Sequence, residues 1–165
     1  MNTIKFTDRV QEQFKKAGWE ENRNVKNQYE NANILKFKDF PKFLKDFLYE
    51  YGNLTVLDAK SYESEVTNKL KMGIEYAGYE EEQDYQDDIS MFGKMLFPFA
   101  FWDPDCYMIA CDSDGNVYML GDYTFKIADS FKRGLEILIT DDWSNGFYQF
   151  DEDTGEWIKN KRWDD

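Results

Sequence analysis

The sequence predicts an α+β fold, a single compact domain that combines a meander of strands with amphipathic helices. The first observation is the stretch 95–120, in which three extended, largely apolar segments are separated by two turn motifs. These motifs are Asp103-Pro104-Asp105 and Asp112-Ser113-Asp114-Gly115, whose residue types favour tight turns. The second observation is a set of four segments with apolar residues at helical spacing. The third is a hairpin pattern near the C-terminus, with Gly155 at its turn.

The segment 106–111 is predicted to be a central strand, because apolar or aromatic side chains occupy both of its alternating faces. Pro98 cannot donate a backbone hydrogen bond, so its segment is predicted to be an edge strand or to carry a bulge. Gly115 can adopt the positive φ that closes the following hairpin. Cys106 and Cys111, the only cysteines, are placed on opposite faces of one strand and are not expected to pair.

Four amphipathic helices are predicted from capping residues and apolar stripes. They begin at Asp8, near Pro41, near Glu80 and after Ser130. Asp8 is expected to cap the first helix, with Gln11 as its capping-box partner. Gly52 is expected to end the second helix with a positive φ.

The other segments are predicted to be strands and loops. Residues 20–38 are expected to be mostly loop, with a short strand near Val25. Short strands are predicted at 54–57 and 123–127. Residues 65–76 carry a weaker extended pattern, and its apolar side chains are expected to face inward. These are Val66, Leu70, Met72 and Ile74.

The composition indicates one folded domain with a sizeable core. The chain has 165 residues, of which 42% are hydrophobic and 18% aromatic, so disorder is excluded despite the high charge. No run of about 18 apolar residues is present to span a membrane. The first residues lack the basic and apolar blocks of a signal peptide. With two unpaired cysteines, this predicts a reduced, cytoplasmic chain.

The net charge is −13, and it is unevenly distributed. Residues 1–50 hold 10 basic and 8 acidic side chains, a balance of +2, whereas residues 51–165 hold 10 basic and 25 acidic ones, a balance of −15. A negative field of this size repels nucleic acid and anionic lipid and attracts basic partners. The alternative interpretation is that the acidity only keeps the protein soluble.

The residues required by several kinds of catalysis are missing. There is no histidine, which excludes Ser-His-Asp and Cys-His catalysis and histidine-containing zinc sites. No glycine-rich phosphate loop occurs. The stretches 112–116 and 151–155 pair carboxylates with a glycine, as calcium loops do, but they also have the composition of plain hairpin turns. No catalytic, cofactor-binding or metal-binding residue is predicted.

The order and spacing of several short motifs resemble the third subfamily of the SUKH superfamily. The motifs are Gly18-Trp19 followed by Arg23, Phe43-Leu44, Tyr51-Gly52-Asn53-Leu54, Leu96-Phe97-Pro98, the segment 109–112, Gly115-Asn116-Val117-Tyr118, and Phe131 with Gly134-Leu135. The similarity covers about residues 8–139 of a single domain spanning 1–165, and 140–165 is predicted to be an extension with the hairpin. Asn53 stands where a second glycine is usual, and Ala100 where a glycine often follows the proline.

The resemblance implies helices flanking an antiparallel sheet and a role as a cytosolic immunity protein, or antitoxin, of a bacterial toxin system. Such a protein is not an enzyme and has no cofactor. It binds a cognate secreted toxin, often a nuclease such as an RNase, and covers the basic active-site cleft without contacting nucleic acid or membrane itself. The alternative is a regulatory or scaffold interaction protein of the same fold.

Acidic clusters and one tryptophan are the predicted partner-binding residues, because acids steer a basic partner and tryptophan is favoured at binding hot spots. They are Glu80, Glu81, Glu82, Asp84, Asp87 and Asp88, which we call the acidic run, together with Asp103, Asp105, Asp141, Asp142 and Trp143. Arg23 is expected either to pair with a buried carboxylate or to line a ligand groove. Trp163, in a highly charged tail, is the tryptophan most expected to be exposed.

Overall fold

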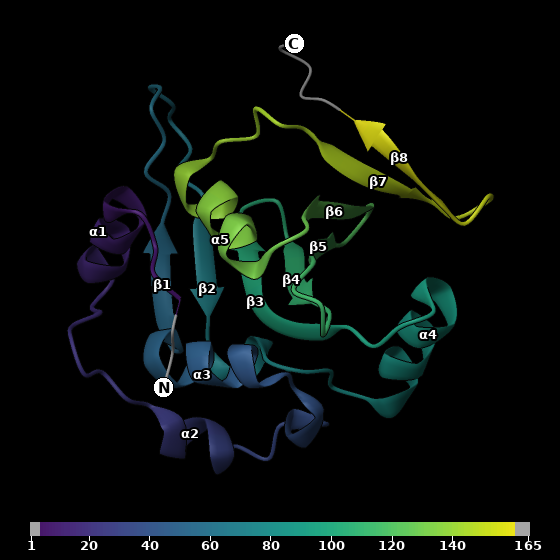
Figure 1. Cartoon of the computed structure of the whole chain (residues 1–165), viewed down its shortest axis with the longest axis horizontal. Coiled ribbons are helices and arrows are strands. Elements are labelled where there is room, and N and C mark those ends of the chain that lie inside the picture. Colours follow the sequence, from purple (N-terminus) through teal and green to yellow (C-terminus); the bar gives the residue numbers. More distant parts are fainter. Residues whose placement is uncertain (1–3, 161–165) are drawn as a thin grey trace.

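The computed structural model describes residues 4–160, which form one eight-stranded antiparallel sheet and five α-helices (Figure 1). The strands lie in sequence order, so the sheet is a simple meander. They are β1 (Leu54–Leu57), β2 (Lys69–Met72), β3 (Phe97–Asp103), β4 (Tyr107–Cys111), β5 (Val117–Leu120), β6 (Thr124–Ala128), β7 (Phe147–Asp151) and β8 (Glu156–Asn160). The helices are α1 (Asp8–Lys16), α2 (Lys26–Glu30), α3 (Lys42–Tyr51), α4 (Glu82–Phe92) and α5 (Phe131–Thr140), with 3₁₀ turns η1 (Phe37–Asp39) and η2 (Ile74–Tyr76). The predicted α+β class with a C-terminal hairpin is confirmed.

One face of the sheet carries the main core. Leu70 pairs with Trp102, and Ile109 with Met119, so these side chains share that face. The apolar sides of α1, α3 and α5 cover it, contributing Phe14, Phe47 and Leu135 among others, all fully buried. We call this the helix-covered face.

The opposite face is more thinly covered. Phe101 pairs with Met108, and Met108 with Leu120, which places their side chains on this second face. All three side chains are only half-buried. Near α4 the face holds a smaller cluster, in which Phe92 and Trp157 pack against buried Tyr118. In Figure 1, α4 stands beside the strands, away from the other helices.

The central meander agrees with its prediction in most respects. β4 lies inside the sheet, and Gly115 has φ +91°. Pro98 lies in an interior strand with a bulge between Pro98 and Ala100, so the bulge is confirmed. Cys106 is not on the strand as predicted but in the preceding turn, with φ +63° and an exposed side chain. Cys111 is buried, and neither cysteine forms a disulfide.

Two helix starts differ from the prediction. Thr7, not Asp8, caps α1, because its hydroxyl accepts the Val10 N–H at 3.4 Å. Gln11 does not complete a capping box, and its side-chain oxygen accepts the Tyr51 hydroxyl at 3.3 Å instead. α4 begins at Glu82, so Glu80 lies outside the helix. The Ser130 cap of α5 is confirmed, with the Arg133 N–H donated to its hydroxyl at 3.1 Å.

The segment between α1 and α3 contains helix where a strand was predicted. No strand forms near Val25 within the described residues, and α2 begins directly after it. The Val25 N–H donates to the Tyr49 carbonyl of α3 at 2.7 Å, and Tyr29 is fully buried. Farther along the chain, Leu70 and Met72 of β2 are buried as expected, whereas Val66 is 50% exposed.

Candidate functional site

The acidic run forms one wall of a groove on the second sheet face. The groove has a volume of about 730 Å³ and lies between α4, the segment that precedes it, and strands β3 to β5. Its acidic lining residues are Glu75, Glu80, Asp84, Asp87 and Asp88, and its floor includes Tyr76, Phe101, Met108 and Leu120. We call it the acidic groove. Of the acidic run, Glu81 and Glu82 do not line it, and Glu82 instead pairs with Lys36 at 3.2 Å.

Asp88 is the most enclosed carboxylate of the acidic run. The Tyr79 hydroxyl donates a hydrogen bond to it, which joins α4 to the preceding segment. Burial raises the pKa of Asp88, and the neighbouring charges of Asp84 and Asp87 raise it further. Burial and the same carboxylate also raise the pKa of Tyr79. The carboxylate is therefore fixed in place within a strongly anionic setting.

Asp103 lies on the same sheet face but has its charge compensated. Its carboxylate accepts the Lys71 ammonium at 2.9 Å across strands β2 and β3. This contact raises the pKa of Lys71. Asp103 thus joins neighbouring strands and adds little free negative charge.

A second recess lies on the helix-covered face and gathers three other predicted residues. It has a volume of about 250 Å³. Asp105, Asp141 and Trp143 line it, and most of the remaining lining is aromatic or aliphatic. That remainder is Tyr62, Asn68, Trp102, Tyr107, Met119, Phe125, Ile127 and Phe147. We call it the aromatic pocket.

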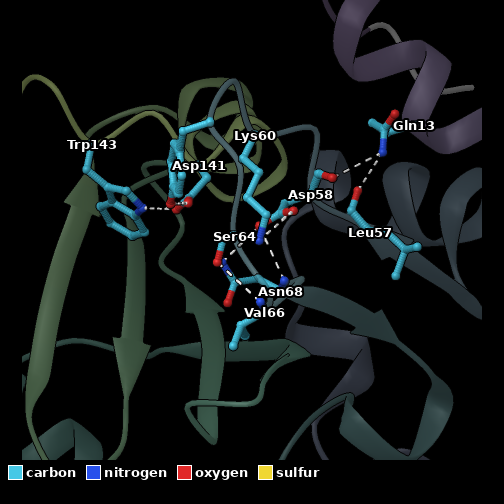
Figure 2. Close-up of polar contacts among 10 residues, drawn as sticks. Gln13, Leu57, Asp58, Lys60, Ser64, Val66, Asn68, Asp141 and Trp143 are labelled. Atoms are coloured by element: carbon cyan, nitrogen blue, oxygen red, sulfur yellow. Dashed lines mark hydrogen bonds and ion pairs between the residues drawn. The ribbon is translucent and has the colours of Figure 1, made fainter.

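Asp141 holds the rim of the aromatic pocket together. The indole N–H of Trp143 donates to its carboxylate at 2.7 Å, and the hydroxyl of Tyr62 donates to the same carboxylate. Trp143 also packs edge-on against Phe147, with ring centroids 6.1 Å apart. Its half-buried ring is therefore already engaged within the fold, as Figure 2 shows for its contact with Asp141.

The loop between β1 and β2 contacts this rim through Tyr62, and a polar network lies at the two ends of the loop (Figure 2). The Asp58 carboxylate accepts the side-chain amide of Asn68 at 2.9 Å and lies 3.9 Å from the Lys60 ammonium. Gln13 of α1 donates to the Leu57 carbonyl at 2.9 Å, beside it. Burial raises the pKa of Asp58. These contacts fix the start and end of a loop whose middle is exposed.

Two further predicted residues have structural partners. Asp142 lies 3.5 Å from Arg133 of α5, and hydrogen bonds from Ser144 lower its pKa. Arg23 pairs with no buried carboxylate within residues 4–160, since its guanidinium donates to the Glu50 backbone carbonyl at 2.7 Å. It therefore fastens the last turn of α3, and burial lowers its pKa. Trp163 lies outside the described residues.

The structure divides the predicted residues between two sheet faces. The acidic run and Asp103 belong to the second face, whereas Asp105, Asp141 and Trp143 gather at the aromatic pocket on the helix-covered face. Sequence reasoning missed the groove floor. The signal was present in β3 to β5, where Phe101, Met108 and Leu120 are apolar residues on the face away from α1, α3 and α5.

The described residues do not supply a metal site or a membrane span. No group of three or more acidic or cysteine side chains suited to a metal ion occurs among residues 4–160. In the calcium-like stretch, Asp112 accepts the Asn116 side-chain amide, the Tyr118 hydroxyl and the Lys94 ammonium at 2.8–3.1 Å. None of the helices in the described part is long and apolar enough to cross a bilayer.

These features define an α+β protein with an acidic groove on one sheet face and an aromatic pocket on the other. A family model described as SUKH-3 immunity protein matches residues 6–141. The chain therefore belongs to the SUKH-3 immunity protein family. No curated protein and no solved structure matches it. The family match ends at the start of the segment leading to β7 and β8.

Proposed function

We propose that this chain is a cytosolic immunity protein that binds a cognate secreted toxin, a nuclease such as an RNase, and covers its basic active-site cleft. Membership of the SUKH-3 immunity family is the observation that carries the proposal. The family implies a toxin partner, and the surface chemistry of this chain supports a basic one.

Electrostatic complementarity favours a nuclease as the toxin. A nuclease binds a polyanion, so its substrate cleft is basic. This chain carries −13 overall, and its acidic groove has no lysine or arginine among its lining residues. Opposite potentials across an interface raise the association rate and select the partner. An acidic protein seated on the cleft would exclude RNA or DNA by occupying its binding surface.

The proposed role is stoichiometric binding without catalysis or a cofactor. The chain has no histidine, and most of the carboxylates described above are engaged in ion pairs or hydrogen bonds. We expect the purified protein to leave RNA, DNA and polysaccharide substrates intact. Turnover that disappears on substitution of a single carboxylate would overturn the non-enzymatic proposal.

The test is co-expression with the toxin domain encoded beside this chain. We expect the pair to form an equimolar complex and the toxin to lose its nuclease activity on a labelled RNA or DNA. An unrelated protein of similar size and negative charge serves as the control for nonspecific polyanion inhibition. Nuclease activity that an excess of this chain leaves unchanged contradicts the proposal. A complex in which the nuclease stays active would favour the regulatory or scaffold role.

A further inference from the structure

The acidic groove combines an apolar floor with a negative rim. Phe101, Met108 and Leu120 of three adjacent strands face it, and each is only half-buried. Tyr76 stacks on Phe101, with ring centroids 5.4 Å apart and an interplanar angle of 19°. The floor therefore combines a stacked aromatic pair with two partly exposed aliphatic side chains.

The rim carries negative charge that the chain itself does not neutralise. No ion pair among residues 4–160 involves the five acidic lining residues, and none of the lining residues is basic. Lys71 is on the same sheet face, but its ammonium is paired with Asp103. Asp84 lies three and four residues before Asp87 and Asp88 on α4, a spacing at which like charges repel.

The wall of the groove is held in a fixed geometry. The hydrogen bond from Tyr79 to Asp88 ties α4 to the segment that follows η2, and the Gly78 N–H donates to the Pro98 carbonyl of β3 at 2.8 Å. These two contacts link the wall to β3, the strand that supplies Phe101 to the floor. An anionic wall beside an aromatic floor favours the binding of a cation between them.

We propose that the acidic groove receives an arginine-bearing loop from the basic cleft of the toxin, an inference that rests on the proposed function. Charge complementarity selects a cationic occupant over a second copy of this acidic chain. Arginine fits better than lysine, because its planar guanidinium stacks on aromatic rings and pairs with two carboxylate oxygens at once. The aromatic pocket, on the other sheet face, is outside this interface.

The test compares two identical substitutions at different places. Met108→Lys puts an ammonium inside the groove, whereas Met95→Lys puts one on the exposed segment that follows α4 and does not line it. Both change the net charge equally. With the toxin domain as the binding partner, we expect Met108→Lys to weaken binding by at least about tenfold and Met95→Lys to change it little.

A second pair of variants guards against misfolding of Met108→Lys. Asp84→Asn with Asp87→Asn removes two exposed rim charges, and Glu152→Gln with Asp153→Asn removes two exposed charges in the turn between β7 and β8. We expect only the first pair to weaken binding, again by about tenfold. Thermal midpoints of all variants establish that each protein is folded.

The outcomes separate this inference from the proposed function. If wild type binds the toxin domain tightly and the groove variants bind it equally well, the acidic groove is not the binding site. The proposed immunity role is unaffected by that result. If groove variants and control variants weaken toxin binding equally, the proposed role of the groove is also wrong, because net charge alone then accounts for the effect. If wild type does not bind the toxin domain, the immunity role and the groove both fail.

Discussion

Gly52 and Asn53 form the turn that connects α3 to β1. Gly52 has φ −59°, so the predicted positive φ is wrong at this position; Asn53 adopts it instead, at +63°. Gly52 is required for another reason, since an added Cβ would lie 2.2 Å from a ring carbon of Tyr29 and 2.4 Å from the Leu48 carbonyl oxygen. Asparagine tolerates the left-handed region better than most residues, which explains why it can replace a glycine at 53.

Gly52→Ala is expected to destabilise the protein through this steric conflict. Tyr29 is fully buried and the Leu48 carbonyl belongs to the helix backbone, so neither can move freely. We expect the free energy of unfolding to fall by about 1–3 kcal/mol, measured by denaturant titration. As a control, Asn53→Gly retains the positive φ and is expected to change it by less than about 1 kcal/mol. An unchanged denaturant midpoint for Gly52→Ala would show that Tyr29 has room to move.

α4 and the C-terminal hairpin support one another at the scale of secondary-structure elements. Tyr85 is the only buried residue of α4, so the helix has little core of its own. Phe92 in its last turn stacks on Trp157 of β8, with ring centroids 6.1 Å apart. Trp157 also contacts Tyr118 and Phe150, at 5.7 and 5.0 Å between centroids. The hairpin beyond the family match therefore helps to hold the helix that forms one wall of the acidic groove.

Trp157→Ala is expected to loosen both elements. We expect a loss of about 2 kcal/mol in unfolding free energy, less than for a fully buried tryptophan because Trp157 is partly exposed. We also expect faster amide hydrogen exchange in α4, a measurement that reports on this helix more specifically than the free energy of unfolding of the whole protein. Ile158→Ala, at a neighbouring residue that is 48% exposed, is expected to change stability by less than about 0.5 kcal/mol. Unaltered exchange in α4 in the Trp157 variant would show that the helix does not depend on the hairpin.

For the whole molecule, the uneven charge distribution governs how a partner approaches. The excess of acidic side chains lies in residues 51–165, which contain the whole sheet and α4. Long-range attraction acts before contact and is screened by salt, whereas contacts within a formed complex are screened less. Charge should therefore affect association more strongly than dissociation.

Reversing Glu81, Asp84 and Asp87 to lysine is expected to slow association with the toxin domain. Asp88 is left unchanged because it accepts the Tyr79 hydroxyl and supports the fold. For wild type, we expect rising ionic strength to lower the association rate constant by about tenfold or more, with little change in dissociation. The triple variant should show a slower and less salt-dependent association at a nearly unchanged thermal midpoint. If the triple variant associates with the toxin domain at the wild-type rate and with the wild-type salt dependence, the acidic run does not steer association and only keeps the protein soluble.

Elements whose causes lie within a few neighbouring residues can be predicted from the sequence. Turn residues placed the hairpins at 103–105, 112–115 and around Gly155, because their backbone preferences act within a few residues. Apolar or aromatic side chains on both faces identified β4 as a central strand, and Ser130 marked the start of α5. The order of short motifs identified the SUKH-3 family before any contact was known.

Which side chains contact one another depends on packing between elements that are distant in the sequence. α2 forms where a loop with a strand was predicted, because burial of Tyr29 and the bond from Val25 to α3 outweigh a weak local pattern. Asp103 already has a partner, Lys71, which is distant in the sequence and is brought beside it by the pairing of β2 with β3. The predicted acids and tryptophan separate onto two sheet faces, because α4 lies beside the second face, whereas the loops that carry Asp105, Asp141 and Trp143 meet at the aromatic pocket.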